Sequence, residues 1–331
     1  MKLAIGGKFY CLNREMPYGG ERQIVYLAEE LAKRGHEIFV FAQTGSWIPG
    51  CTIIETNINN NYKDNFADAI ENSGIDFNTA ILSDDTGVFN MPRFPFKYFF
   101  VPYGYRVPVV SDKNCNVVCQ SQSQFNILKH PNSCVISPGL PSDLYKPSSE
   151  RGDYWCWVGK INQVKPVHWI VEACMKRKEK LIICAFIEDF DYFGHFVKPY
   201  IDNKNIVLLE NVNDYEKIEI LSKAKGLLSP VNCQETFGIN HIESLMCGTP
   251  VIYNDLHGIY NQHAPIFHYG SESCCIRVEG KDDLTEKFSQ KMDEIKPEMN
   301  KFAREFALKN FDIKVIADKW ESLVGKSLNG R

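Results

Sequence analysis

Hydrophobic residues recur along the chain in short runs, and longer segments with helical spacing separate the runs. Between residues 21 and 37, Ile24, Leu27 and Leu31 fall on one face of a helix. Gly35 then supplies the residue type that commonly ends a helix. Short apolar runs that alternate with helices are typical of a parallel sheet with helices on both faces. In the first part of the chain we expect strands at 2–5, 38–42, 51–56, 79–83, 98–102, 116–120 and 133–137, and a short helix at 123–130.

The same rhythm restarts after a segment rich in Pro, Ser, Gly and charge, "PGLPSDLYKPSSERGDY", at 138–154. Such a composition indicates a linker. Here we expect strands at 154–160, 181–187, 205–210, 226–230 and 250–253, with helices at 166–178, near 191–203, at 214–224 and at 238–247. The last part of the chain reads as helix, with a break at "KNFD". The sequence therefore predicts an α/β protein with two doubly wound parallel-sheet domains, 1–146 and 153–311, whose strand ends face a shared cleft.

Composition narrows the classes of function. The 331 residues carry a formal net charge of −4, which gives no basic field for nucleic acid or anionic lipid. No apolar run approaches the roughly 18 residues of a membrane span, and the N-terminus lacks the apolar core of a signal peptide. The twelve cysteines form no C-x-x-C pair, which disfavours a zinc site. We expect reduced thiols and a cytoplasmic protein with no metal.

The candidate chemistry lies at 234–250, "QETFGINHIESLMCGTP". Glu235 precedes a predicted helix that begins near Gly238, and Glu243 lies in its second turn. The N–H groups and dipole of a helix N-terminus favour anions. Two separated carboxylates can each hold a hydroxyl pair of an extended ligand such as a nucleotide sugar. The alternative is that Glu235 only complements the helix dipole and that Glu243 is solvated.

This stretch resembles the E-x7-E signature of the family 4 retaining glycosyltransferases, which have the GT-B fold. The matching residues are Glu235, Phe237, Gly238, Glu243, Gly248, Pro250 and Val251. Further stretches resemble the family in the same order, namely "PYGGERQIVYLAEELAKRGHEIFVF", "VISPGLPSDLYKP", "WVGKINQVKP" and "FAREFALKNFDIKVIADKW". The resemblance implies two Rossmann-like domains that face a cleft, with a C-terminal helix at about 312–331 returning to the first domain.

The resemblance also implies roles for residues in the donor half. Glu235 would contact the donor sugar, Glu243 the ribose, and Lys165 and Lys160 the diphosphate, with lysine at 160 where the family usually has arginine. Backbone N–H groups at Phe237 and Gly238 would face the sugar and diphosphate, and Gly19 and Gly20 would approach the diphosphate or the acceptor. We place Ile187 and Val212 against the base. For the lysines and glycines the alternatives are surface solubility and a plain turn.

One departure concerns the first domain. Many relatives have a histidine near the sugar, whereas the comparable stretch here, "YFFVPYGYRVPVV", has none. We expect either that Tyr103 or Arg106 takes over its polar contact or that the transferred sugar differs from a common hexose. Asp84 or Asp85 would bind acceptor hydroxyls, with an Asx turn as the alternative.

The sequence thus predicts a retaining, metal-independent hexosyl- or pentosyltransferase without a cofactor. Its donor would be a UDP-, GDP- or ADP-sugar, and its acceptor a hydroxyl group of a glycan, lipid, protein or modified nucleic acid base. Two alternatives stay open. The first is a non-catalytic nucleotide- or sugar-binding protein of GT-B shape. The second is a nucleotide-dependent oxidoreductase, although no G-x-G-x-x-G follows any predicted strand.

Overall fold

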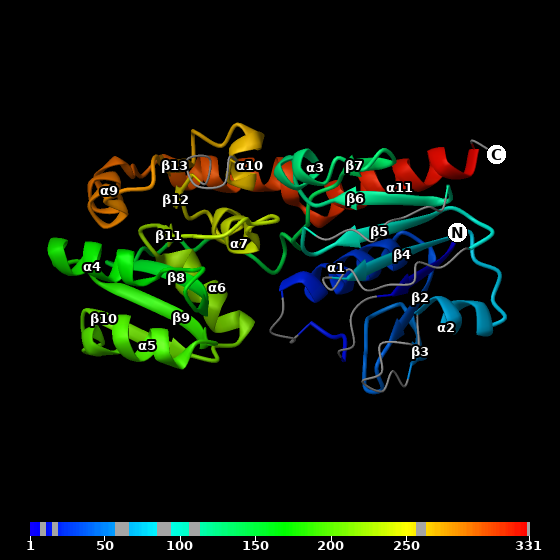
Figure 1. Ribbon diagram of the computed structural model, residues 1–331, viewed down its shortest axis with the longest axis horizontal. Coiled ribbons are helices and arrows are strands. Elements are labelled where there is room, and N and C mark those ends of the chain that lie inside the picture. Colours follow the sequence, from blue (N-terminus) through cyan, green and yellow to red (C-terminus); the bar gives the residue numbers. More distant parts are fainter. Residues whose placement is uncertain are drawn as a thin grey trace. The chain divides into compact units, whose positions relative to one another are not determined.

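The computed structural model describes residues 1–6, 11–14, 19–56, 66–84, 94–105, 113–255 and 263–329. The chain divides into two compact units, each built around its own sheet (Figure 1). Unit 1 comprises Met1–Pro141 and Phe311–Arg331, and unit 2 comprises Ser142–Asn310. The division falls inside the 138–154 segment that composition marks as a linker. Residues 142–146, which we expected in the first domain, belong to unit 2, where the Tyr145 hydroxyl bonds to Glu243.

Unit 1 holds a parallel seven-stranded sheet in the order β3-β2-β1-β4-β5-β6-β7. Its strands are β1 (Lys2–Gly6), β2 (Glu37–Ala42), β3 (Thr52–Glu55), β4 (Thr79–Asp84), β5 (Tyr98–Pro102), β6 (Cys115–Cys119) and β7 (Ser133–Val135). Its helices are α1 (Gly19–Lys33), α2 (Phe66–Asn72), α3 (Gln122–Leu128) and α11 (Ile313–Asn329). The strand order reverses between β1 and β4, and ligands bind beyond the strand ends at such a switch point.

Unit 2 holds a parallel six-stranded sheet in the order β10-β9-β8-β11-β12-β13. Its strands are β8 (Trp155–Ile161), β9 (Leu181–Ile187), β10 (Ile206–Glu210), β11 (Leu227–Ser229), β12 (Val251–Asn254) and β13 (Cys275–Val278). The helices are α4 (His168–Arg177), α5 (Phe190–Phe196), α6 (Asp214–Lys223), α7 (Ile239–Met246), α9 (Leu284–Lys291) and α10 (Met299–Phe311), with 3-10 turns η1 (Lys198–Tyr200), η2 (Pro265–Tyr269) and η3 (Met292–Glu294). Here the strand order reverses between β8 and β11.

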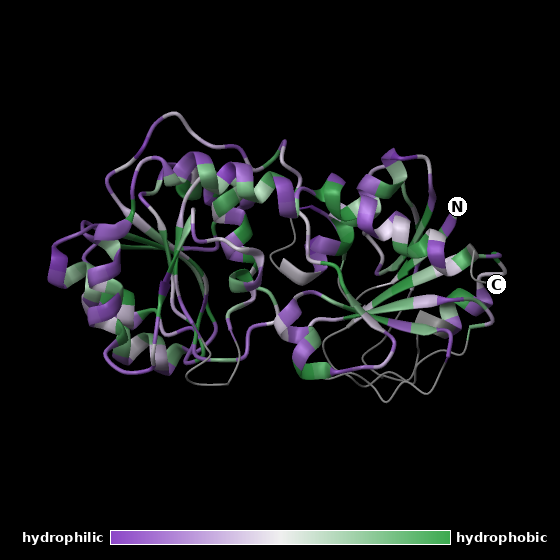
Figure 2. Ribbon diagram, turned by 90° about the horizontal axis from the view of Figure 1, so that it is seen from above, coloured by the Kyte–Doolittle hydropathy of each residue, from purple (hydrophilic) through white to green (hydrophobic). Residues whose placement is uncertain are grey.

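Apolar strands fill the middle of each unit, and the helices carry polar and apolar residues side by side (Figure 2). In unit 2, Trp157, Ile183 and Leu228 lie in one buried cluster. In unit 1, Tyr98 and Phe100 of β5 lie in another. This arrangement confirms the predicted α/β class and the predicted strands.

The structure corrects the expected helix near 191–203. It ends as α5 at Phe196, and a 3-10 turn follows at Lys198–Tyr200. Pro199 lies in this turn and has no N–H to continue the helix. The C-terminal break is confirmed, because α10 and α11 are separate helices and Asp312 forms a β-bridge to Leu140. Residues Phe311–Arg331 belong to unit 1, as the resemblance implies.

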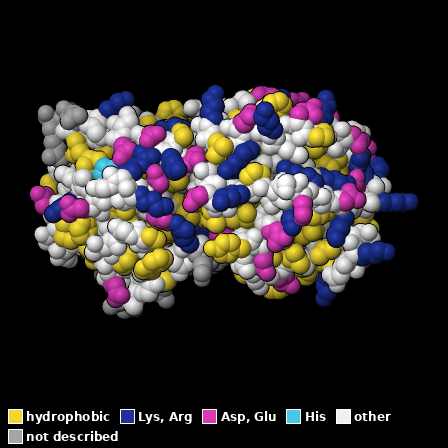
Figure 3. Space-filling view, turned by 180° about the vertical axis from the view of Figure 1, so that it is seen from behind, with side chains coloured by type: hydrophobic (Ala, Val, Ile, Leu, Met, Phe, Trp, Pro, Cys, Tyr) yellow, Lys and Arg dark blue, Asp and Glu magenta, His cyan; other side chains and the backbone are white. Residues whose placement is uncertain are grey.

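Basic and acidic side chains intermingle on the face shown in Figure 3. No helix within the described ranges is long and apolar enough to cross a membrane. All twelve cysteines are free, and the adjacent Cys274 and Cys275 have their Sγ atoms 4.0 Å apart.

Candidate functional site

Two side chains of opposite charge meet at the switch point of unit 2. Strands β8 and β11 are neighbours, and the chain leaves both at the same edge of the sheet. The loop after β8 carries Lys165, and the loop after β11 carries Glu235. Lys165 Nζ lies 3.8 Å from Glu235 Oε2, and these side chains are 29% and 20% exposed. The structure therefore places this predicted pair together, within reach of a ligand.

Helix α7 (Ile239–Met246) begins four residues after Glu235. Gly238 is its N-cap, with φ +86° and ψ +64°, a left-handed conformation that favours glycine. A Cβ atom at this position would lie 3.1 Å from Nδ1 of the His241 ring. Glycine at 238 is therefore favoured both by its backbone conformation and by the limited space. The His241 N–H donates to Gly238 O at 3.0 Å, so the N–H groups of Gly238, Ile239 and Asn240 are those for which the helix itself provides no partner.

His241 packs beneath this helix start as a neutral ring. Its Nε2 lies 2.7 Å from Ser229 Oγ, at the end of β11. Burial lowers the pKa of His241 to about 3, and the charge of Lys165 acts in the same direction. The imidazole therefore carries no charge at neutral pH, so the positive charge beside Glu235 comes from Lys165.

A thiol also lies near the Lys165–Glu235 pair. Burial raises the pKa of Cys233 to about 11, and the charge of Glu235 adds to this effect. A thiol must ionise to act as a nucleophile. Cys233 therefore stays protonated near neutral pH.

Glu243 has different surroundings from Glu235. Its Oε1 accepts hydrogen bonds from Lys217 Nζ at 2.7 Å and from the Tyr145 hydroxyl at 2.9 Å. Lys217 Nζ also lies 2.8 Å from Asp214 Oδ1. The side chains of Lys217 and Glu243 are only 8% and 3% exposed. The alternative of a solvated Glu243 is therefore wrong, because the carboxylate belongs to a buried ion pair.

Whereas Lys165 pairs with Glu235, Lys160 forms an ion pair with Glu188. Its Nζ lies 2.7 Å from Glu188 Oε1, and both side chains are partly exposed. Hydrogen bonds from Lys160 and then Asn162 are the largest causes that lower the pKa of Glu188. A phosphate would have to compete with Glu188 for this ammonium group.

The remaining donor-side residues lie at the same edge of the sheet. The side chain of Phe237 is buried, with its ring centroid 6.4 Å from that of Tyr269, so only its backbone is available to a ligand. Ile187 ends β9, and Val212 follows the neighbouring strand β10. Within the described part of the chain, no group of three or more His, Cys, Asp or Glu side chains is placed to hold a metal ion.

In unit 1 the structure brings Tyr103 and Gly20 together. Gly19 and Gly20 begin α1, and Tyr103 follows β5. The Tyr103 hydroxyl donates to the carbonyl oxygen of Gly20 at 2.9 Å. Asp84 ends β4, and its side chain is not described. Asp85 and Arg106 lie outside the described residues, so their predicted roles stay predictions.

Sequence reasoning missed the groups that support these residues. Lys217 and Ser229 belong to none of the matched stretches, and Tyr145 lies in the matched stretch "VISPGLPSDLYKP" without a role assigned to it. The one signal in the sequence was the three-residue spacing of Asp214 and Lys217, which brings two side chains together on a helix.

Comparison with known proteins gives a match to a family model over part of the chain, and a fold. Residues 146–264 match the family model described as "Glycosyl transferases group 1". A search of curated proteins found no match.

Among the solved structures that are similar to this chain are a glycosyltransferase, a sucrose-phosphate synthase and a protein in complex with UDP-glucose. AviGT4, a glycosyltransferase involved in avilamycin A biosynthesis, has a TM-score of 0.75 at 16% identity, over 100% of this chain and 98% of its own. Sucrose-phosphate synthase from Thermosynechococcus elongatus has a TM-score of 0.76 at 15% identity, over 100% of both chains. Anabaena Alr3699/HepE in complex with UDP-glucose has a TM-score of 0.72 at 11% identity, over 99% of this chain and 100% of its own. The chain therefore has the GT-B fold, and the match of residues 146–264 to a glycosyl transferase family supports sugar transfer as its class of activity.

Proposed function

We propose that this protein transfers a sugar from a nucleoside-diphosphate sugar to a hydroxyl acceptor. The observation that carries the proposal is the 3.8 Å contact between Lys165 and Glu235 at the switch point of unit 2, next to the glycine-capped start of α7. An ammonium group and helix N–H groups suit a diphosphate. A half-buried carboxylate beside them suits the hydroxyls of the attached sugar.

In the reaction the acceptor oxygen forms a bond to the anomeric carbon. The bond from that carbon to the β-phosphate oxygen breaks, and the acceptor hydroxyl proton passes to the departing diphosphate. Negative charge grows on the departing diphosphate, where Lys165 and the N–H groups at Gly238 would stabilise it. Glu235 would hold the sugar in place. Lys160 would add a second positive charge once phosphate displaces Glu188.

Two finer features belong to the proposal. Because the lysines and the helix start can balance the charge of the diphosphate, the reaction would need no metal ion. We also propose that the anomeric configuration is kept through attack from the face that the diphosphate leaves, without a protein nucleophile.

Glu243 would bind the ribose, held in orientation by Lys217 and Tyr145. Ile187 and Val212 would contact the base. Since the HepE structure was solved with UDP-glucose, a UDP-sugar is the first donor to test, before GDP- and ADP-sugars.

The test is release of nucleoside diphosphate from a panel of UDP-, GDP- and ADP-sugars, with water or simple hydroxyl compounds as acceptors. We expect turnover with one nucleotide class, equal rates with and without EDTA, and retained anomeric configuration by NMR. Loss of all turnover in EDTA would contradict the metal-free mechanism. An inverted product would contradict retention.

One observation favours the runner-up, a non-catalytic nucleotide- or sugar-binding protein. Tyr103, expected to replace the family histidine, donates its hydroxyl proton to the Gly20 backbone. Tight binding of a nucleotide sugar without turnover in the same panel would favour this alternative.

A further inference from the structure

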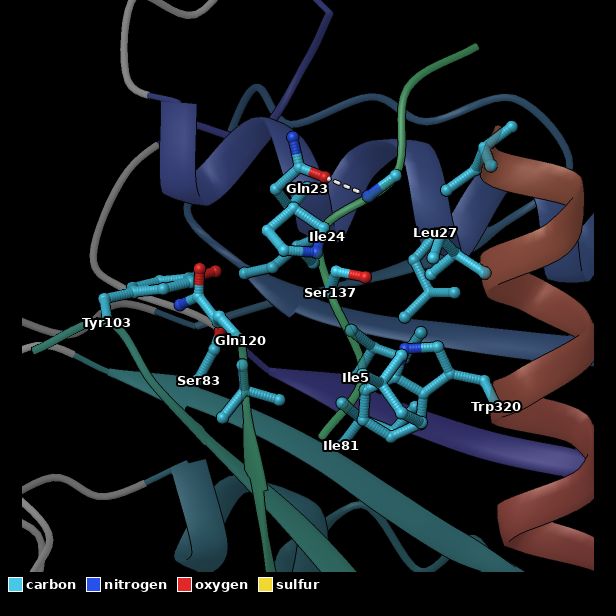
Figure 4. A pocket seen from close by; sticks show the side chains of 16 residues that line it. Ile5, Gln23, Ile24, Leu27, Ile81, Ser83, Tyr103, Gln120, Ser137 and Trp320 are labelled. Carbon is cyan, nitrogen blue, oxygen red and sulfur yellow. Dashed lines mark hydrogen bonds between the residues drawn. The ribbon is translucent and has the colours of Figure 1, made fainter. Parts of the chain in front are cut away.

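A pocket opens in unit 1 at the switch point of its sheet (Figure 4). Its floor comes from the ends of β1 and β4, and its walls from α1 and α11. Its apolar lining includes Ile5, Ile24, Leu27, Ile81, Ile316 and Trp320. None of these side chains belongs to the proposed donor site.

The pocket has one polar end and one apolar end. In Figure 4, Tyr103, Ser83 and Gln120 lie at one end, and Trp320 lies at the other. Trp320 is buried and packs edge-on against Phe99, with ring centroids 5.8 Å apart. Tyr103 and Val101 are only half-buried. The accessible mouth is therefore at the Tyr103 end, beside Gly20.

The polar groups at the mouth already donate to the backbone. The Tyr103 hydroxyl donates to Gly20 O at 2.9 Å, and Gln120 Nε2 donates to Pro102 O at 3.0 Å. Ser83 Oγ donates to Gly6 O at 3.3 Å. These three donors have partners, whereas Gln23 Nε2, a buried atom of another lining residue, has no hydrogen-bond partner among the described residues. The pocket would therefore recognise a ligand mainly by apolar contact, with Gln23 Nε2 as one available donor.

The size of the pocket limits what can enter. Its volume is about 50 Å³. One water molecule needs roughly 10–15 Å³ of such space, so the pocket takes only a handful of non-hydrogen atoms. A short alkyl group or one small ring fits this limit, and a long lipid chain does not.

We propose that this pocket binds a small apolar group of the hydroxyl acceptor, whose hydroxyl end stays at the mouth beside Tyr103. This proposal rests on the proposed transferase function, because it assigns unit 1 to the acceptor. It narrows the acceptor to compounds in which a short alkyl group or single ring lies close to the reacting hydroxyl.

The probes are ethanol and 1-butanol, two hydroxyl compounds that differ by two methylene groups. The protein has five tryptophans, so indole N–H signals can be followed by NMR and the Trp320 signal assigned with Trp320→Phe. At about 0.8 kcal/mol per buried methylene, 1-butanol should saturate the Trp320 shift with a dissociation constant about tenfold below that of ethanol. Equal affinities would overturn the proposal.

Val101→Phe should close the mouth and remove the 1-butanol shift at Trp320. Val207→Phe makes the same change at a half-buried strand position of unit 2 and should leave the shift intact. Ser83→Leu fills the pocket from β4 and serves if Val101→Phe fails to fold. Binding of 1-butanol that survives in the folded blocking variants would also overturn the proposal.

The donor assay separates this proposal from the transferase function. If 1-butanol binds at Trp320 but no donor is turned over, the pocket stands and the transferase function falls. If a donor is turned over while 1-butanol leaves Trp320 unaffected, the pocket proposal falls alone.

Discussion

Lys217 Nζ lies 2.7 Å from Glu243 Oε1 in the interior of unit 2, with Tyr145 bonded to the same carboxylate oxygen. Glu235, eight positions earlier, instead faces Lys165 at a partly exposed edge. The two carboxylates of one short motif therefore have different surroundings. Removing Glu243 disturbs a buried ion pair, whereas removing Glu235 disturbs a partly exposed one.

The first prediction concerns Lys217. Lys217→Met would leave the buried Glu243 without its cation, and breaking a buried pair costs about 3–5 kcal/mol. We expect a loss of that size in the free energy of unfolding, measured with urea. Lys223→Met, on the same helix but in a more exposed pair with Glu219, should cost under about 1 kcal/mol. Equal losses of unfolding free energy in the two variants would mean that the buried pair stabilises the fold no more than the exposed pair does.

The second prediction separates structure from binding at Glu243. Glu243→Gln keeps the shape of the side chain but removes its charge. If Glu243 holds the ribose, the affinity for free nucleoside diphosphate should fall by about 1.5–3 kcal/mol, as measured by calorimetry on the folded variant. A lower melting temperature with unchanged nucleotide affinity would limit Glu243 to its structural role.

The sequence predicted most of the fold because apolar runs mark buried parallel strands. β9, "LIICAFI", was predicted with its observed bounds. β13 and α9 were not predicted. The apolar run of β13, "CIRV", has only four residues and does not stand out from the sequence around it. Without that strand, no helix was expected at α9, which comes next along the chain.

For the site, the resemblance to the family 4 glycosyltransferases implied that Glu235 and Lys165 serve the same donor. Spacing could not show that Lys217 neutralises Glu243, because that contact joins α6 to α7 and depends on how the helices pack. It also could not show that Lys160 pairs with Glu188, 28 residues away on a neighbouring strand end. Contacts set by packing carry no local signal in a single sequence.

The third prediction concerns Lys165. Because phosphate charge grows in the transition state, Lys165→Met should lower kcat more than it raises KM. We expect a fall in kcat of about 100-fold or more, on the scale of one lost electrostatic group. Lys160→Met, which removes a lysine already paired with Glu188, should have the smaller effect. An unchanged kcat in Lys165→Met would remove Lys165 from the reaction.

The fourth prediction uses the buried His241. The unfolded chain takes up a proton on this residue near pH 6.5, whereas burial lowers its pKa to about 3 in the folded protein. Its contribution to stability is therefore complete above pH 6.5 and is lost as the pH falls towards 3, at about 1.4 kcal/mol per pH unit. Between pH 6.5 and 5, the wild type should lose about 2 kcal/mol more than His241→Gln. Equal pH dependence in urea unfolding would contradict a buried neutral imidazole.

The last prediction concerns Glu235 and tests the division of roles between the two carboxylates. Because Glu235 is partly exposed and faces Lys165 rather than a buried cation, Glu235→Ala should leave the fold and the affinity for free nucleoside diphosphate nearly unchanged. The transfer rate should fall steeply, since the sugar must be held within about 3–3.5 Å of the attacking oxygen. Discrimination among donor sugars should weaken, because a lost hydroxyl contact removes the penalty for a sugar that cannot make it.

The measurements are calorimetry with nucleoside diphosphate and with the intact donor, together with rates for two epimeric donors. Glu210→Ala, at the exposed end of β10, is the control and should match the wild type. If Glu235→Ala and Glu243→Gln weakened both ligands equally, the two carboxylates would not contact opposite ends of the donor, and Glu235 would be better explained as support for the start of α7.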